Sequence, residues 1–379
     1  MVWIRKTVLY HTLPPCRCHQ YNELLASEEG HRKLKRVLKA WVVDNPGLVY
    51  WQGLDSLAAP FLYLNFNNEA LAWACLSAFI PKYLYNMFQK DNAAVIQEYL
   101  AKFSHLQAFH DPVLFNHLDE IGFIPDLYAI PWVLTMFSHV FPLGKIFHLW
   151  DRLLLGDSSF PLCVGLAVLL QLRPALMEAQ FNECILLFSE MPSVDIDHVV
   201  TQSMDLFTAT PPSISFRAED YHRRSGGSSS SDTQNGGGAE LDIQLLSVQV
   251  LKAEKVGRIS ARDVMNLLAA DGGGQARVQV VDVRPREEVR LGTLPAAVNV
   301  PAQVLVQAGP AQLQDAFPFL EEARQKQRVI AVVGRAEDGG QAARAAEALL
   351  RANYPRVATV HGGIEAFRGA DILALPDTS

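Results

Sequence analysis

The chain has 379 residues, of which 49% are hydrophobic and 19% are charged. This length exceeds one typical domain and suffices for two domains with their own cores. A formal net charge of -7 gives no electrostatic reason to expect a nucleic-acid partner.

The odd count of five cysteines favours a reducing compartment over a disulfide framework. Cys16, Cys18 and His19 resemble half of a metal site, but no second pair at zinc spacing follows, so no metal site is predicted.

The sequence contains no candidate for a signal peptide or a transmembrane segment. Residues 1–6 lack the apolar stretch of a signal peptide. The most apolar run, residues 160–170, is too short to span a bilayer and is flanked by Asp157 and Arg173. The sequence therefore predicts a cytoplasmic chain without a transmembrane segment.

A helix-breaking tripeptide, Asn45-Pro46-Gly47, separates two stretches with helical periodicity. Apolar residues recur at three- and four-residue steps over 34–42 before the break and over 54–62 after it. Proline lacks a backbone donor and biases the preceding residue away from helix. The pattern predicts a corner between two packed helices, with Gln52 and Gly53 in the first turn of the second helix.

Helical periodicity continues from residue 28 to about residue 206. Pro81 is expected to kink or divide one helix, and Pro112 suits a helix start. Because alternating valine and isoleucine are absent, the pattern predicts an all-α domain. The expected helices after the corner cover residues 69–88, 95–109, 111–121, 128–140, 143–155, 160–177 and 181–188.

The composition changes near residue 209. Pro211-Pro212 is followed by a serine and glycine run at 225–231 and by three glycines at 236–238. Such a segment cannot bury enough apolar area to order itself. Residues 211–240 are therefore predicted to form a flexible linker.

Beyond the linker, strands alternate with helices. Residues 278–283, 328–333 and 357–360 have the continuous apolar character of buried parallel strands. Helical patterns cover residues 259–269 and 341–351. This alternation predicts a small α/β domain with a parallel sheet.

Residues 50–53 have the sequence Tyr-Trp-Gln-Gly, which resembles the Tyr-x-Gln-Gly signature of the TBC domain, the all-helical fold of Rab GTPase-activating proteins. The resemblance implies that Gln52 enters the site of a partner GTPase carrying Mg-GTP and positions the attacking water. An amide can orient water without competing for a proton, because it is both donor and acceptor. The alternative is an amide that bonds only its own neighbours at the helix start. The resemblance further implies that Tyr50, Trp51, Gly53 and Asp55 either contact the GTPase or support the motif.

The same resemblance implies an upstream arginine that stabilises charge on the transferring phosphoryl group. Arg17 is the candidate for this second finger. In the family the arginine ends an Ile-x-x-Asp-x-x-Arg run, whereas His11 and Pro14 occupy the positions of the isoleucine and the aspartate here. Residues 1–16 are therefore interpreted as an atypical N-terminal segment, and Arg17 as a finger without its usual anchors.

Two further stretches resemble TBC landmarks: residues 128–132, an aromatic-rich run that ends in Trp132, and the pair Trp150-Asp151. Trp132 and Trp150 are interpreted as core aromatic residues. Asp151 is expected to pair with a basic residue or to cap a turn. The resemblance covers residues 17–210, which are assigned to the TBC domain.

The second domain resembles rhodanese domains at residues 281–284, residues 292–301 and Gly362-Gly363. A rhodanese needs a cysteine in the loop after the fourth strand, where backbone N–H groups cradle an anion. Gly334 occupies this place, Arg335 follows it, and no cysteine occurs beyond Cys184. Without a thiol the domain cannot form a persulfide. Residues 241–379 are thus predicted to be a rhodanese-like domain that is catalytically inactive.

This domain order resembles the C-terminal portion of a TBC-family protein that also has a kinase-like domain. The chain has no Gly-rich loop before a Val-Ala-Ile-Lys strand, no His-Arg-Asp run and no Asp-Phe-Gly. It is therefore expected to be a shortened isoform or a fragment without kinase activity.

Two functions remain open. The first is activation of a Rab GTPase by Gln52 and Arg17 in trans, with no cofactor of the chain's own. The second is a non-catalytic module that binds a Rab and other proteins, the latter through the rhodanese-like domain, within a larger signalling or trafficking assembly. Either function implies peripheral attachment to endomembranes through a Rab partner.

Overall fold

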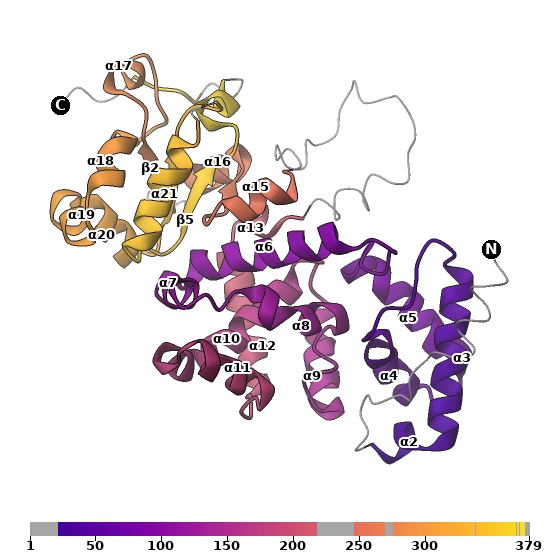
Figure 1. Cartoon of the computed structure of the whole chain (residues 1–379). Helices are drawn as coiled ribbons and strands as arrows, with labels where there is room; N and C mark the ends of the chain where they lie inside the picture. The colour runs from indigo at the N-terminus through magenta and orange to yellow at the C-terminus, as the bar shows by residue number, and fades with distance from the viewer. Residues whose placement is uncertain are drawn as a thin grey trace, which may run out of the picture.

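The computed structural model describes residues 22–217, 246–269, 276–337, 339–368, 370 and 372–375. They form a helical domain (residues 22–217) and an α/β domain (described residues from 246 onward) that contact each other (Figure 1). The prediction of an all-α domain followed by a small α/β domain with a parallel sheet is confirmed. The predicted N-terminal segment 1–16 and residues 218–240 of the predicted linker lie outside the described residues.

Polar residues begin several helices of the helical domain. Side-chain oxygens of Ser27, Asn68, Asp111 and Asp195 each accept a backbone N–H of the first helical turn, which satisfies a donor that has no partner within the helix. The elements are α2 (Glu23–Ala26), α3 (Glu28–Asp44), α4 (Leu54–Leu64), α5 (Glu69–Tyr83), α6 (Ala93–His110), α7 (Pro112–Glu120), η1 (Pro125–Leu127), α8 (Ala129–Thr135), α9 (Leu143–Leu153), α10 (Phe160–Glu178), α11 (Phe181–Ser189), α12 (Ile196–Ala209) and α13 (Pro212–Ser215).

The predicted corner lies between α3 and α4, but Gln52 is not in the first turn of α4. Helix α3 ends at Asp44, and α4 begins only at Leu54. Gly53 is the N-cap residue, with a left-handed φ of 107°. Because this conformation turns the chain before helical hydrogen bonding starts, Gln52 precedes the helix, and the predicted placement is wrong.

Two predicted helices end earlier than their periodicity indicates. Helix α5 continues through Pro81 without a break and stops at Tyr83. Helix α8 stops at Thr135, because Met136 and Phe137 adopt left-handed φ values of 46° and 66°. Left-handed backbone is unfavourable for residues with a Cβ, so the surroundings must stabilise this turn.

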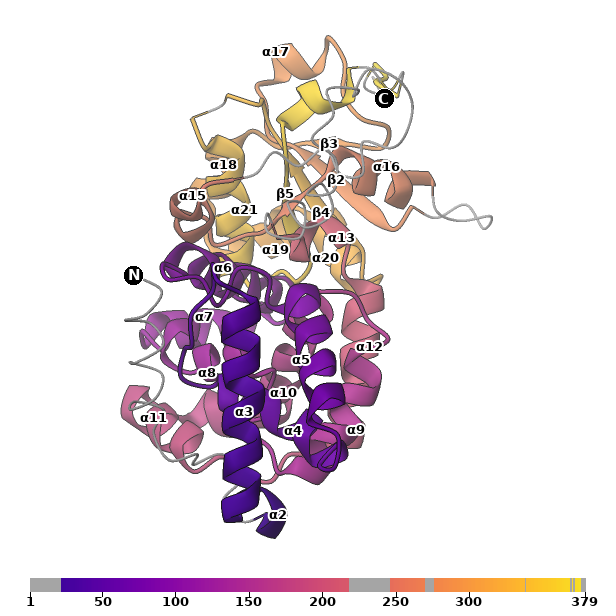
Figure 2. The same ribbon diagram turned by 90° about the vertical axis from the view of Figure 1, so that its right-hand side faces the viewer.

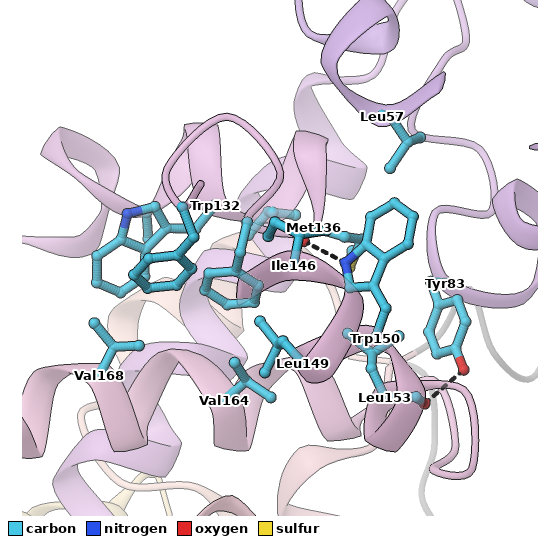
Figure 3. Packing of buried hydrophobic residues seen from close by; sticks show 14 of the residues in the cluster. Leu57, Tyr83, Trp132, Met136, Ile146, Leu149, Trp150, Leu153, Val164 and Val168 are labelled. Carbon is cyan, nitrogen blue, oxygen red and sulfur yellow. Dashed lines mark hydrogen bonds between the residues drawn. The ribbon is translucent and has the colours of Figure 1, made fainter. Parts of the chain in front are cut away.

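The Trp150 indole supplies part of that stabilisation (Figure 3). Its Nε1–H donates to the Met136 carbonyl at 2.9 Å, and the indole stacks on Phe79 with ring centroids 4.7 Å apart. Nearby, the Tyr83 hydroxyl donates to the Leu153 carbonyl at 2.7 Å. These contacts join α5, α9 and the turn after α8 into one buried cluster.

The α/β domain contains a five-stranded sheet of order β1-β5-β4-β2-β3 in which all pairs are parallel. Strands β2, β4 and β5 and helix α21 were predicted from the sequence, whereas β1 and β3 were not, since two residues carry no periodicity. The elements are α15 (Val248–Ala253), β1 (Arg258–Ile259), α16 (Ala261–Ala269), β2 (Val278–Asp282), α17 (Arg286–Val289), β3 (Val298–Asn299), α18 (Ala302–Gln307), α19 (Pro310–Ala316), α20 (Pro318–Gln325), β4 (Val329–Val333), α21 (Gln341–Arg351), β5 (Val357–Val360) and η2 (Gly363–Phe367).

Residues 211–217 were assigned to the flexible linker, yet they are ordered and include α13. Ile214 is fully buried in a hydrophobic cluster of the sheet. The backbone N–H of Ser213 donates to Asp263 at 2.9 Å, and the Ser213 hydroxyl accepts the Ser260 N–H at 3.0 Å. Burial of Ile214 and these bonds outweigh the local preference for a linker.

Helix α10 is the one described helix that is long and apolar enough, by length and composition, to cross a membrane. Of its most apolar window, 67% is buried inside the protein. Helices α6, α7 and α12 pack against it. This is the environment of a core helix in a folded domain.

Two histidines lie near the junction of the two domains, His105 buried and His110 half-buried. His105 is hydrogen-bonded to the Glu254 carbonyl at 2.8 Å, and His110 to the Thr210 hydroxyl at 2.7 Å. Burial lowers the pKa of His105 to about 4, and the charge of Lys102 adds to this effect. Burial likewise lowers the pKa of His110 to about 3, with a contribution from Arg356.

Replacement of Trp150 by phenylalanine is expected to lower the free energy of unfolding by about 2–3 kcal/mol, because the buried Met136 carbonyl loses its donor and the site loses volume. Trp51→Phe is the matched control: this indole also donates to a carbonyl, at 2.8 Å, but its side chain is 38% exposed. We expect a loss below about 1 kcal/mol for the control. Urea unfolding of both variants measures the difference, and equal losses would contradict a special role for Trp150.

Stability is expected to fall as the pH decreases from about 6.5 toward 4. The unfolded chain takes up protons on His105 and His110 near pH 6.5, whereas the folded chain does so only near their depressed pKa values of about 4 and 3. In this window each histidine therefore contributes a loss of about 1.4 kcal/mol per pH unit at most. Urea unfolding at pH 7 and pH 5 measures the slope. His105→Gln and His110→Gln should each reduce it, and an unchanged slope in both variants would refute this cause.

Candidate functional site: the Gln52 turn and the Gly334 loop

The backbone that leads to Gln52 is attached to the segment after α5. The Val49 N–H donates to the Phe88 carbonyl at 2.8 Å, and Leu48 forms an isolated antiparallel bridge with Gln89. The Trp51 indole then donates to the Gln89 carbonyl at 2.8 Å. Three successive contacts thus fix the chain immediately before Gln52.

The other side of the turn rests on the end of α8. A Cβ at Gly53 would lie 2.9 Å from the Thr135 methyl carbon, closer than real Cβ contacts allow. The Thr135 hydroxyl donates to the Pro131 carbonyl at 2.6 Å, and the Ser138 hydroxyl donates to the Ser56 carbonyl at 2.8 Å. Glycine is therefore needed at residue 53 for two reasons, its positive φ and this close approach.

The side chain of Gln52 is exposed and makes no hydrogen bond with a described residue. The alternative that its amide bonds its own neighbours is thus not observed within the described ranges. Tyr50 is half-buried against the helical core, and Asp55 lies in the first turn of α4, where a carboxylate is favoured by the helix dipole. A rigid turn that presents a free amide can place that amide in the site of a docked partner.

Arg17 lies outside the described residues, as do Cys16, Cys18 and His19. Among the residues that are described, no group of three or more His, Cys, Asp or Glu side chains could hold a metal ion.

The other sequence landmarks are structural or exposed. Trp132 and Trp150 are both 4% exposed and belong to the core of the helical domain. Asp151 lies exposed within α9, and its carboxylate pairs with no residue in the described part of the chain. The expected ion pair or turn cap at Asp151 is therefore not found there.

Sequence reasoning missed three residues that position the turn: Thr135, Ser138 and Gln89. Thr135 and Ser138 fall within the aromatic-rich stretch that was predicted to be one helix. Only the end of α8 brings them to Gly53 and Ser56, and no local pattern signals this contact.

A second candidate site is a cavity of about 230 Å³ at the carboxyl ends of β2 and β4. Arg335 forms an ion pair with Glu288 at 2.7 Å across it. At its base the buried Arg284 guanidinium bonds Asp282, with the closest N–O distance 2.6 Å. Among the described residues, those that line it carry no thiol or hydroxyl; they are Val283, Arg284, Pro285, Glu288, Gly334, Arg335, Glu337 and Gln341.

The loop after β4 is folded despite the missing cysteine. The Ile364 N–H donates to the Gly334 carbonyl at 2.9 Å, and the Ala336 N–H donates to Glu365 at 2.9 Å. A Cβ at Gly363 would lie 2.5 Å from the Ala336 nitrogen. The described part of the loop thus has a compact backbone, but the loop sequence contains no thiol that could form a persulfide.

Comparison with known families agrees with this architecture. Residues 11–177 match the family model of the Rab-GTPase-TBC domain, and residues 264–370 match that of the rhodanese-like domain. The chain therefore carries a TBC domain followed by a rhodanese-like domain.

The chain is 51% identical to the TBC domain-containing protein kinase-like protein of Gallus gallus, over 95% of this chain and 42% of that protein. It is 29% identical to the GTPase-activating protein GYP5 of Eremothecium gossypii, over 40% of this chain and 18% of that protein. The chain thus spans less than half the length of either relative. The solved structure of the Ypt/Rab-GAP domain of Gyp1p is 20% identical and superposes with a TM-score of 0.48, covering 54% of this chain and 73% of that chain.

Gly53→Ala is expected to lower the free energy of unfolding by about 1–3 kcal/mol, because alanine is strained at a φ of 107° and meets the Thr135 methyl group. Gly47→Ala in the same loop is the control: its Cβ would have no neighbour within 4 Å, so a change within about 0.5 kcal/mol is expected.

A double variant separates the two causes. Thr135→Ser keeps the hydroxyl that bonds Pro131 but removes the methyl group that faces Gly53. If steric contact contributes, the cost of Gly53→Ala is smaller in the Thr135→Ser background. An identical cost in both backgrounds would assign the whole effect to backbone strain.

Proposed function

We propose that this chain stimulates GTP hydrolysis by a Rab-family GTPase and that Gln52 acts in trans on the Mg-GTP bound to that partner. The observation that carries the proposal is the exposed Gln52 amide on a turn that is fixed on both sides. The match of the surrounding residues to the Rab-GTPase-TBC domain supports the choice of partner. Such a partner would bring the chain from the cytoplasm to endomembranes.

In the proposed reaction the chain positions the attacking water and stabilises the negative charge that develops on the phosphoryl group. In GTP hydrolysis, water attacks the γ-phosphorus while negative charge spreads over the phosphoryl oxygens and the leaving oxygen. The Gln52 carbonyl oxygen can accept a hydrogen bond from this water, and its NH₂ group can donate to a phosphoryl oxygen. Because the backbone of residues 49–53 is already fixed, this segment loses little conformational entropy when a partner binds.

Arg17 is proposed as a second finger that neutralises the developing charge. An arginine in this role can contribute about 10³–10⁵ in rate. His11 and Pro14 replace the residues that anchor it in other TBC domains, so its contribution is proposed to be smaller than that of Gln52.

The second candidate function is a non-catalytic module that binds a Rab and further proteins. The replaced anchors before Arg17 and the thiol-free loop at Gly334 favour it. Under this proposal the exposed Gln52 turn contributes to binding, and the rhodanese-like domain adds a docking surface for other proteins.

Single-turnover GTP hydrolysis by a panel of Rab proteins distinguishes the two functions. The parent chain is compared with Gln52→Ala, Arg17→Ala and, as a control, Gln307→Ala, which removes an exposed glutamine from the other domain. We expect acceleration by the parent, a loss of about 10²-fold or more with Gln52→Ala, and parental rates with Gln307→Ala.

The same panel decides the role of each finger. Loss with Gln52→Ala but not with Arg17→Ala would remove Arg17 from the mechanism. Binding of a GTP-loaded Rab without acceleration by the parent would refute activation and support the non-catalytic module.

A further inference from the structure

Helix α6 belongs to the helical domain but is covered on its outer side by the α/β domain. Both views show it between the helices below and the sheet with α15 above (Figures 1 and 2). Twelve of its 18 residues are buried, four of them polar or charged: Glu98, Lys102, His105 and Gln107. A helix at the free surface of a domain would expose such residues.

The hydrophobic clusters on the two faces of the sheet are each completed by the helical domain. Ala108 and Phe115 belong to the cluster that contains Val281 and Val332. Phe109 and Ile214 belong to the other cluster, with residues of the opposite strand faces such as Val280 and Val333. The contact is thus a continuation of both cores rather than a polar surface between two finished domains.

Backbone groups also bond across the junction. The Arg356 N–H, just before β5, donates to the Phe109 carbonyl at 2.6 Å. The Asn116 amide donates to the Leu350 carbonyl and to the Asn353 side chain, both at 2.8 Å. These bonds connect the last turn of α6 and the middle of α7 to the end of α21 and the turn that follows it.

Asp119 on α7 is paired with two segments of the α/β domain, one between α15 and β1 and the other at the end of α21. Lys255 and Arg351 each donate to its carboxylate at 2.7 Å. Burial would raise the pKa of Asp119, but the hydrogen bonds from Lys255 and Arg351 outweigh it and lower the pKa below its ordinary value. The pKa of this TBC-domain carboxylate is therefore lowered by two cations of the α/β domain.

We propose that the rhodanese-like domain is a permanent structural part of the TBC domain, with α6 and α7 as the surface it covers, and that the two unfold as one unit. Contacts with the TBC domain involve Arg356 before β5 and the C-terminal end of α21, at the amino end of the sheet. The cavity near Gly334 lies at the opposite, carboxyl end, close to α17, which is remote from α6 in both views. The domain thus has a structural function that requires its fold and does not require a cysteine.

The test keeps the full chain and cuts it after folding. A protease recognition sequence is inserted within residues 225–231, and the purified chain is cleaved there. We expect the two pieces to co-elute in size-exclusion chromatography and to melt in one transition whose calorimetric and van't Hoff enthalpies agree. Pieces that separate while each keeps its circular dichroism spectrum, or two independent transitions, would overturn the proposal.

A matched pair of variants ties the result to this junction. Asp119→Asn removes the charge that Lys255 and Arg351 share, whereas Glu120→Gln removes the neighbouring exposed charge from the same end of α7. We expect Asp119→Asn to weaken the association of the cleaved pieces at least about tenfold and Glu120→Gln to change it less than about twofold. Equal effects of the two variants would contradict the proposed surface.

Discussion

The structure depends most on the burial of α6 between two domains. Lys102 shows the constraint this imposes: burial lowers its pKa to about 8, although the charges of Glu98 and Glu254 oppose the shift. Glu254 comes from the α/β domain, and its carbonyl also bonds His105. A buried polar group costs free energy unless a partner meets it, and Glu254 of the α/β domain acts on both Lys102 and His105 of α6. Two buried polar residues of α6 thus interact with a residue of the second domain.

A second, local constraint acts at the Gln52 turn. Gly53 must have a positive φ and must also admit the Thr135 methyl group, so this part of the signature is explained by backbone geometry and contact alone. The exposed Gln52 amide has no such structural explanation, since it bonds no described residue. The two adjacent residues of one motif thus differ: the geometry of the turn explains Gly53, whereas Gln52 is explained only by the proposed contact with a partner.

The sequence predicted what periodicity and composition determine. Strands β2, β4 and β5 and helix α21 are long and apolar enough to be recognised. The early end of α8 was missed because Met136 and Phe137 take a left-handed conformation that is stabilised in part by the distant Trp150. At the site, Gln52 and Gly53 were found through their resemblance to a family. Thr135 was not, because its contact with Gly53 joins distant parts of the chain.

The thiol-free rhodanese-like domain follows from the same distinction between shape and chemistry. Its loop at Gly334 remains compact through bonds from Ile364 and Ala336, none of which needs a cysteine. The amino end of its sheet contacts α6 and α7 through backbone hydrogen bonds and apolar side chains. None of these contacts involves the thiol-free loop at Gly334. The proposed structural role of the domain therefore depends on its amino-terminal sheet end and not on the chemistry of this loop.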